Sequence, residues 1–165
     1  MNNKLLSFLA DEALASGFKP KSTSRTFKIS ENKDAEGVLY GSVYCVAVIL
    51  SADEQVELEN EAISKNSLKT KIKNIKRIKI ENNNELIPLY WGKDAAVGYR
   101  LYRHILNKKP KAGCIGLRFY KSLQDKDLIL ASLPVNDFKG FEEHMENKYP
   151  PMLYNVKRSS IHFFT

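Results

Sequence analysis

The chain is organised around one stretch of sequence, Leu89-Tyr90-Trp91-Gly92-Lys93-Asp94-Ala95-Ala96-Val97-Gly98-Tyr99-Arg100-Leu101-Tyr102-Arg103-His104-Ile105. Its first residues are apolar and aromatic, which is typical of a strand. Gly92 permits a turn, and Asp94 stands where a helix N-cap belongs. On the helix that should follow, Arg100 and His104 share one face. Such pairs are common on solvated helix faces, so the meaning of this one depends on the rest of the chain.

Length and composition predict one domain spanning residues 1–165. The chain is 43% hydrophobic, which is enough to build a buried core. No apolar run approaches the roughly 20 residues that cross a bilayer, and the N-terminus lacks a secretory pattern. We therefore expect a cytoplasmic protein without a membrane partner. Cys45 and Cys114 lie in apolar surroundings and predict buried thiols instead of a disulfide or a metal site.

The net charge of +7 favours a polyanionic partner, because Lys and Arg release counterions when they meet phosphates. Basic residues concentrate in residues 65–79, where no acidic residue intervenes. The periods of helix and strand both partly fit this block, so its conformation stays open. The block predicts a DNA-binding surface made of Lys69, Lys71, Lys73, Lys76, Arg77 and Lys79, with Arg103 from the expected helix. The alternative is a solvated sheet edge protected by lysines.

Hydrophobic periodicity and turn residues place the other elements. Residues 38–50 form a continuous apolar strand whose two faces should both be covered. Asp137 is a plausible N-cap for a helix whose apolar side is Phe138, Phe141, Met145 and Tyr149. The remaining expected elements are a helix over 4–16 ended by Gly17, strands over 25–29, 114–120, 127–133 and 161–164, and a hairpin around 78–87.

The order of several motifs resembles the GIY-YIG nuclease superfamily. Ser42-Val43-Tyr44 corresponds to the first motif of the family, and Tyr90-Trp91-Gly92 corresponds to the second. Arg100 and His104 follow the second motif at the family's spacing. The chain departs from the family pattern at Ser42, where glycine is usual, at Trp91, where isoleucine is usual, and at Asp94, where threonine is usual.

The later part of the resemblance is a glutamate on a helix, followed by proline and Asn155. Glu142 has the matching distance to Pro151 and the matching helix phase, whereas Glu143 has the matching distance to Asn155. We choose Glu142, because helix phase is set by geometry and a loop can absorb one residue. Residues 51–84 separate the two tyrosine motifs much further than in the family.

The resemblance implies an α+β fold, with a small, mainly antiparallel sheet flanked by helices. Residues 51–84 would then be a lysine-rich insertion between the first two core strands, and residues 1–36 an N-terminal extension. The implied activity is a divalent-metal-dependent DNA endonuclease of restriction, mobile-element or repair type. Double-stranded DNA is the expected partner, and a homodimer is one way to cut both strands.

The implied catalytic residues are Tyr44, Tyr90, Lys93, Arg100, His104, Glu142 and Asn155. Glu142 would hold a Mg²⁺ or Mn²⁺ ion, and Arg100 would grip the scissile phosphate. Tyr44 would act as general base and pass its proton to His104. The other three would position water or phosphate and support the site.

Two alternatives remain open from the sequence. The chain could be a non-catalytic nucleic-acid-binding module that keeps the fold and the basic surface. It could also be a cysteine hydrolase that uses Cys45 or Cys114 together with His104.

Overall fold

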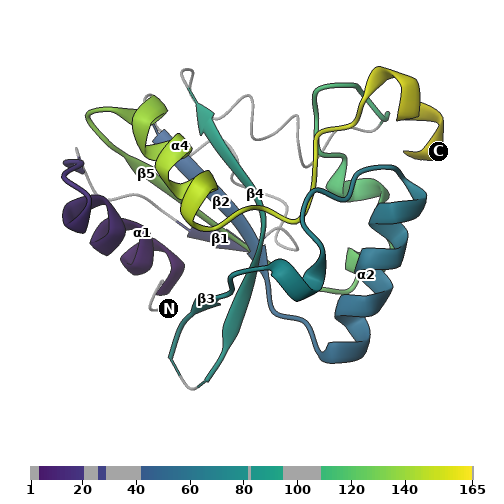
Figure 1. Cartoon of the computed structure of the whole chain (residues 1–165), viewed down its shortest axis with the longest axis horizontal. Coiled ribbons are helices and arrows are strands. Elements are labelled where there is room, and N and C mark those ends of the chain that lie inside the picture. Colours follow the sequence, from purple (N-terminus) through teal and green to yellow (C-terminus); the bar gives the residue numbers. More distant parts are fainter. Residues whose placement is uncertain (1–3, 21–25, 29–41, 82, 95–108, 165) are drawn as a thin grey trace.

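The computed structural model describes residues 4–20, 26–28, 42–81, 83–94 and 109–164, and within them it shows an antiparallel sheet with helices on both faces (Figure 1). The strands lie in the order β1-β5-β2-β4-β3. Their bounds are β1 (Thr26–Lys28), β2 (Ser42–Val48), β3 (Ile78–Lys79), β4 (Glu85–Asp94) and β5 (Leu128–Pro134). The α+β class with an antiparallel sheet flanked by helices is confirmed.

The helices divide between the two faces of the sheet. Both α1 (Lys4–Ala15) and α4 (Phe138–Lys148) pack on one face. The other face is covered by α2 (Ala52–Ser64) and by short 3-10 segments. The 3-10 segments are η3 (Ile72–Asn74), η4 (Leu117–Phe119), η5 (Lys121–Leu123) and η6 (Arg158–Phe164). None of the helices in the described ranges has the length and apolar character needed to cross a membrane.

The central strand is β2, which pairs with β5 on one side and β4 on the other. All seven of its residues are buried, as its continuous apolar sequence predicts. Tyr44 and Val46 join the core that includes α2, whereas Val43 and Cys45 join the core beneath α1 and α4. Alternation along one strand therefore supplies both halves of the core.

The strand β4 carries a bulge that changes which way its side chains point. Val46 pairs with Tyr90, but the next residue of β2 pairs with Pro88, so Leu89 is the extra residue. Proline lacks an N–H group and is tolerated at such irregular positions. Leu89 and Tyr90, although consecutive, consequently both face the core that includes α2.

The segment after α4 covers the exposed edge of β4. The N–H of Met152 donates to the carbonyl of Pro88 at 2.9 Å, and the N–H of Leu153 donates to the carbonyl of Leu89 at 3.2 Å. Because β3 is only two residues long, this edge would otherwise be unpaired beyond Leu86. The backbone of residues 151–155 is thereby held beside β4.

Two of the three predicted helices lie within the described residues, and both form for the reasons that the sequence suggested. Asp137 caps α4 by accepting a hydrogen bond from the N–H of Gly140 at 3.0 Å, and Phe141 and Met145 are buried. The first helix ends before Gly17, whose φ of 83° is left-handed, as expected of a glycine stop.

Residues 51–84 contain three different conformations. The first part is α2, whose N-terminus has a complete capping box between Ser51 and Glu54. The lysine-rich block 65–79 is mostly irregular, with η3 in its middle and β3 at its end. The predicted hairpin is confirmed: β3 pairs with β4, and Asn83 adopts a left-handed φ of 61° in the turn.

Two predicted strands are wrong. Residues 114–120 contain η4, which follows Gly116 with a left-handed φ of 67°, and residues 161–164 belong to η6. Both segments are apolar because Ile115, Leu117 and Phe164 pack into the core. Burial in a short helical turn produces the same apolar run as a strand, so composition could not separate them.

Candidate functional site

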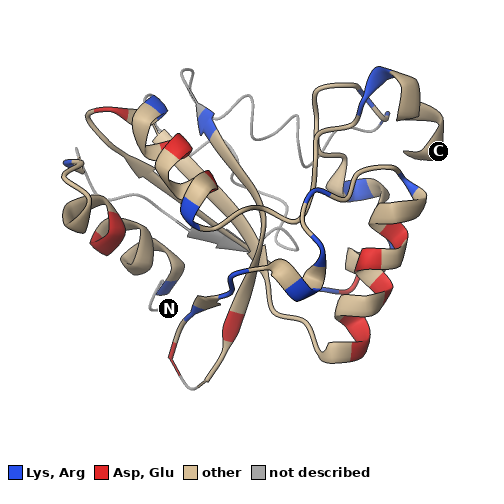
Figure 2. Ribbon diagram, in the orientation of Figure 1, with Lys and Arg blue, Asp and Glu red and all other residues tan. Residues whose placement is uncertain are grey.

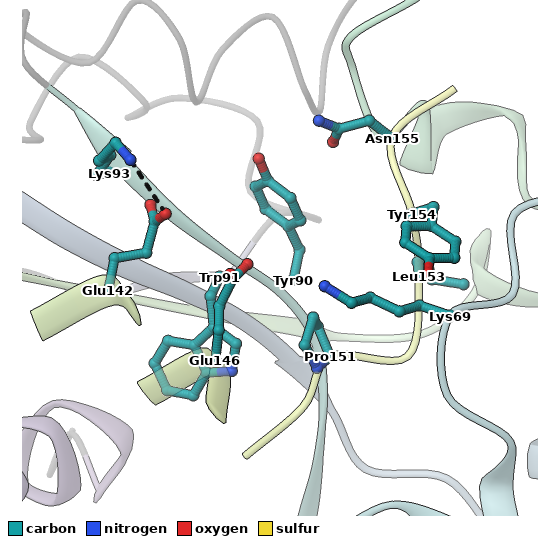
Figure 3. Close-up of a pocket in the computed structure, with 10 residues that line it drawn as sticks. All are labelled: Lys69, Tyr90, Trp91, Lys93, Glu142, Glu146, Pro151, Leu153, Tyr154 and Asn155. Carbon is teal, nitrogen blue, oxygen red and sulfur yellow. Dashed lines mark hydrogen bonds and ion pairs between the residues drawn. The ribbon is translucent and has the colours of Figure 1, made fainter. Parts of the chain in front are cut away.

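A pocket of about 240 Å³ lies where α4, the end of β4 and the segment 151–155 meet (Figure 3). In the close-up, the charged side chains of Lys93 and Glu142 face each other, and the hydrogen-bonding side chains of Tyr90 and Asn155 lie near them. Its polar lining includes Lys69, Tyr90, Lys93, Glu142, Glu146 and Asn155.

Four of the residues implied as catalytic line this pocket. Tyr90 and Lys93 come from β4, Glu142 comes from α4, and Asn155 comes from the segment that follows this helix. These positions are up to 65 residues apart in the chain, between Tyr90 and Asn155. The pairing of residues 152–153 with β4 brings them together.

Glu142 forms an ion pair across the pocket. Its Oε1 lies 3.4 Å from Nζ of Lys93, and the side chains are 16% and 37% exposed. Glu143 is exposed and does not line the pocket. Of the two glutamates that the sequence left as candidates, Glu142 is therefore the one in the pocket.

The two motif tyrosines lie on neighbouring strands despite the long segment between them. Their ring centroids are 6.1 Å apart, with an interplanar angle of 47°. Tyr90 is 9% exposed and lines the pocket, whereas Tyr44 is 0% exposed and does not. Of these two tyrosines, only Tyr90 presents its phenol to a molecule in the pocket.

The prediction of a turn at Gly92 is wrong, because this residue lies inside β4 directly opposite Tyr44. A Cβ atom at Gly92 would lie 2.2 Å from Cζ and 2.3 Å from the hydroxyl oxygen of Tyr44. The Tyr44 ring therefore occupies the space that any larger residue at this position would need. Glycine is required here by a close cross-strand contact and not by chain reversal.

Replacing Gly92 with alanine should lower the free energy of unfolding by about 1–3 kcal/mol, because the buried Tyr44 ring must move. The melting temperature should fall by roughly 3–10 °C in thermal unfolding. In a Tyr44→Leu background the same change should cost less, because the clashing ring atoms are gone. Equal costs in both backgrounds would show that the ring contact is not the reason for glycine.

The oxygen donors of the pocket suit a hard divalent cation. Glu142 and Glu146 are one helical turn apart and both line the pocket. Oδ1 of Asn155 is buried and has no hydrogen-bond partner among the described residues. Mg²⁺ is often held by one or two carboxylates and keeps several waters, so Glu142 and Glu146 fit such an ion without a third protein ligand. Within the described ranges, no group of three or more His, Cys, Asp or Glu side chains could hold a metal ion.

Three predicted site residues lie outside the described residues. These are Arg100, Arg103 and His104, together with the helix on which the sequence places them. Their assigned roles stay predictions.

Most basic residues of the lysine-rich block are exposed. Figure 2 shows their positions along the ribbon. Lys71, Lys73 and Lys79 are exposed. Nζ of Lys76 lies 4.7 Å from the ring centroid of Tyr149, and Arg77 contacts the side chains of Gln55 and Glu85. Lys69 is the member of the block that reaches the pocket.

Sequence reasoning missed two polar residues of the pocket, Glu146 and Tyr154. Glu146 could have been found from its spacing, since it follows Glu142 by four positions on the same helix. No local pattern distinguishes Tyr154 from other surface tyrosines, apart from its place beside Asn155.

The two cysteines that a cysteine hydrolase would use are both buried, and their predicted partner His104 lies outside the described residues. Cys45 is fully buried in β2, and burial raises the pKa of its thiol well above the usual value, which disfavours the reactive thiolate. Ser16 and His144 are 3.0 Å apart, but Glu12 approaches the same ring nitrogen at 3.8 Å. A catalytic triad orients the histidine through its other nitrogen, so this contact is structural.

No protein-family model matches the chain, and no curated protein or solved structure is significantly similar to it. The site is therefore interpreted from its geometry and from the motif resemblance described above.

Proposed function

We propose that the protein is a divalent-metal-dependent endonuclease that hydrolyses phosphodiester bonds in DNA. The observation that carries this proposal is the meeting of Tyr90, Lys93, Glu142 and Asn155 in one pocket. Tyr90, Glu142 and Asn155 belong to the ordered motifs of the resemblance, and the common location of all four residues depends on long-range contacts. A carboxylate, a cation, a phenol and an amide are also the groups that this hydrolysis uses.

Glu142 and Glu146 would hold the cation at the side of the pocket formed by α4. When bound, the cation would stabilise negative charge on the phosphate and lower the pKa of a coordinated water. A carboxylate accepts several bonds, so Glu142 can bind Lys93 through Oε1 and a cation as well. Lys93 then places a positive charge within reach of the same phosphate.

Of the two motif tyrosines, Tyr90 is the one that can contact the attacking water, because it lines the pocket and Tyr44 does not. A free phenol has a pKa of about 10, and neighbouring cations favour its ionised form. We therefore assign the general-base role to Tyr90. Tyr44, packed behind it, would keep its ring in place. Arg100 retains the role that the resemblance implies, and His104 would take the proton from Tyr90 instead of Tyr44.

Nicking of supercoiled plasmid by the purified full-length chain tests this function. Cleavage should require Mg²⁺ or Mn²⁺ and stop on addition of EDTA. Failure to cut any plasmid, linear duplex or single strand with either metal would overturn the proposal.

A non-catalytic DNA-binding module is the second candidate. The ion pair between Lys93 and Glu142 favours it, because an ammonium group at 3.4 Å already neutralises the carboxylate. Tight, salt-sensitive DNA binding without cleavage would identify this alternative.

The lysine-rich block should contribute to duplex binding through phosphate contacts. Changing Lys71 and Lys73 together to glutamate should weaken binding about tenfold and reduce the salt slope by about 2. These two are chosen because Lys76 and Arg77 have packing or ion-pair roles. Fluorescence anisotropy across a salt series measures both quantities.

The matched control exchanges Lys19 and Lys139 for glutamate, because both are exposed and lie outside the block. Equal losses in the two double variants would mean that net charge alone matters. An unchanged salt slope in the first variant would mean that the block only solvates an edge.

A further inference from the structure

One aromatic side chain at the pocket is exposed to solvent. Tyr154 lines the pocket and is 42% exposed, while the neighbouring Leu153 is buried. It directly precedes Asn155, which lies near the Tyr90 ring in the close-up, so Tyr154 and Asn155 belong to the same short segment (Figure 3). The proposed nuclease mechanism leaves Tyr154 without a role.

Two lysines flank this aromatic ring. Nζ of Lys69 is 5.4 Å from the ring centroid of Tyr154, and Nζ of Lys157 is 5.3 Å from it. Both lysines are exposed and have long, flexible side chains. An ammonium group interacts weakly with an exposed ring, so either lysine can leave it for a phosphate.

The backbone under Tyr154 is firmly held. Its N–H donates to the carbonyl of Ser67 at 2.8 Å, next to the bridge between Leu68 and Leu153. Two residues later, the N–H of Val156 donates to the carbonyl of Cys114 at 2.6 Å. The ring is therefore presented from a fixed position, which lowers the entropic cost of binding.

We infer that Tyr154, Lys69 and Lys157 form a stacking platform for an unpaired base of DNA next to the scissile phosphate. A base stacks on an aromatic ring through its π-face, while lysines on either side bind the flanking phosphates. Within a continuous duplex each base is already stacked between its neighbours. The platform therefore selects DNA that is single-stranded, or carries a flap or bubble, at the pocket. The platform limits the DNA that the proposed nuclease would bind to DNA with an unpaired base. Binding of that base does not depend on the proposed nuclease function, and only the cleavage step rests on it.

Binding to two labelled oligonucleotides tests the platform. One is a single strand with bases, and the other is an abasic strand of equal length with the same phosphates. Anisotropy is measured in EDTA, so that the result does not depend on cleavage. The wild-type chain should bind the base-bearing strand more tightly. Tyr154→Ala should weaken that binding by about 5- to 100-fold and change binding of the abasic strand by less than about twofold.

Two further variants define the controls. Tyr154→Phe keeps the ring and should bind within about twofold of the wild type. Phe163→Ala removes another exposed aromatic ring, 43% exposed and outside the pocket, and should leave both affinities unchanged. Lys69→Gln and Lys157→Gln should each reduce the salt slope for the single strand by about 0.7.

Equal binding of the two strands by the wild type would overturn the platform, as would an equal loss on both strands in Tyr154→Ala. Cleavage assays on plasmid, linear duplex and single-stranded DNA report separately on catalysis. Base-dependent binding without cleavage would contradict the nuclease and support the platform. Cleavage without base-dependent binding would contradict the platform and support the nuclease.

Discussion

Glu142→Gln should lower metal-dependent DNA cleavage by about 100-fold or more. Loss of a residue that only hydrogen-bonds to a metal ligand typically costs about 10- to 100-fold, and loss of the ligand itself should cost at least as much. The change removes the negative charge that holds the cation while keeping the size of the side chain. It also leaves Lys93 without its ion-pair partner. This pair is partly exposed, so the loss of stability should stay below about 1 kcal/mol. Initial rates over a range of Mg²⁺ concentrations, with thermal unfolding, measure both effects.

The adjacent residue provides a matched control. Glu143→Gln makes the same chemical change one position along α4, on an exposed side chain outside the pocket. It should cleave at nearly the wild-type rate. If both variants lost activity equally, the cause would be general charge and not a metal site. If Glu142→Gln kept full activity, the assignment of this pocket as the catalytic centre would be wrong.

Tyr90→Phe should lower the cleavage rate by about 10²- to 10⁴-fold, the usual contribution of general-base catalysis. Only the hydroxyl is removed, so the packing of the ring against Tyr44 should be kept. The physical reason is access: the phenol of Tyr90 reaches the pocket and that of Tyr44 is buried. Single-turnover cleavage at saturating protein separates the chemical step from DNA binding.

Tyr44→Phe distinguishes the two phenols. We expect a smaller loss than in Tyr90→Phe, because Tyr44 contacts Tyr90 but not the pocket. Tyr120→Phe is the control, since this tyrosine is buried in the same core and lies outside the pocket. A larger loss in Tyr44→Phe than in Tyr90→Phe would return the base role to Tyr44, as the motif resemblance implies. Full activity in both would exclude the two motif tyrosines as the base.

Elements with a strong local signal were predicted well. The helix α4 is an example, because Asp137 supplies a cap, and Phe141 and Met145 recur at helical spacing. The central strand β2 was recognised from its continuous apolar run. The strand prediction failed near Leu117, where the apolar residues belong to a 3-10 turn. The turn prediction failed at Gly92, which is glycine because the Tyr44 ring on the neighbouring strand lies against it. A contact between residues on different strands produces no pattern in the sequence around either residue.

The sequence by itself determined the chemical identity of the candidate site, the helices α1 and α4 and the strands β2 and β5, because caps, periodicity and motif order act over a few residues. It did not predict α2. Only the tertiary structure decided which candidates share the pocket. The bulge at Leu89 turns Tyr90 toward it, the bonds from residues 152–153 to β4 bring Asn155 and Tyr154 to it, and helix phase selects Glu142 over Glu143. The bulge and these bonds depend on register between segments far apart in the chain. That register is set by the packing of the whole core, which local patterns do not encode.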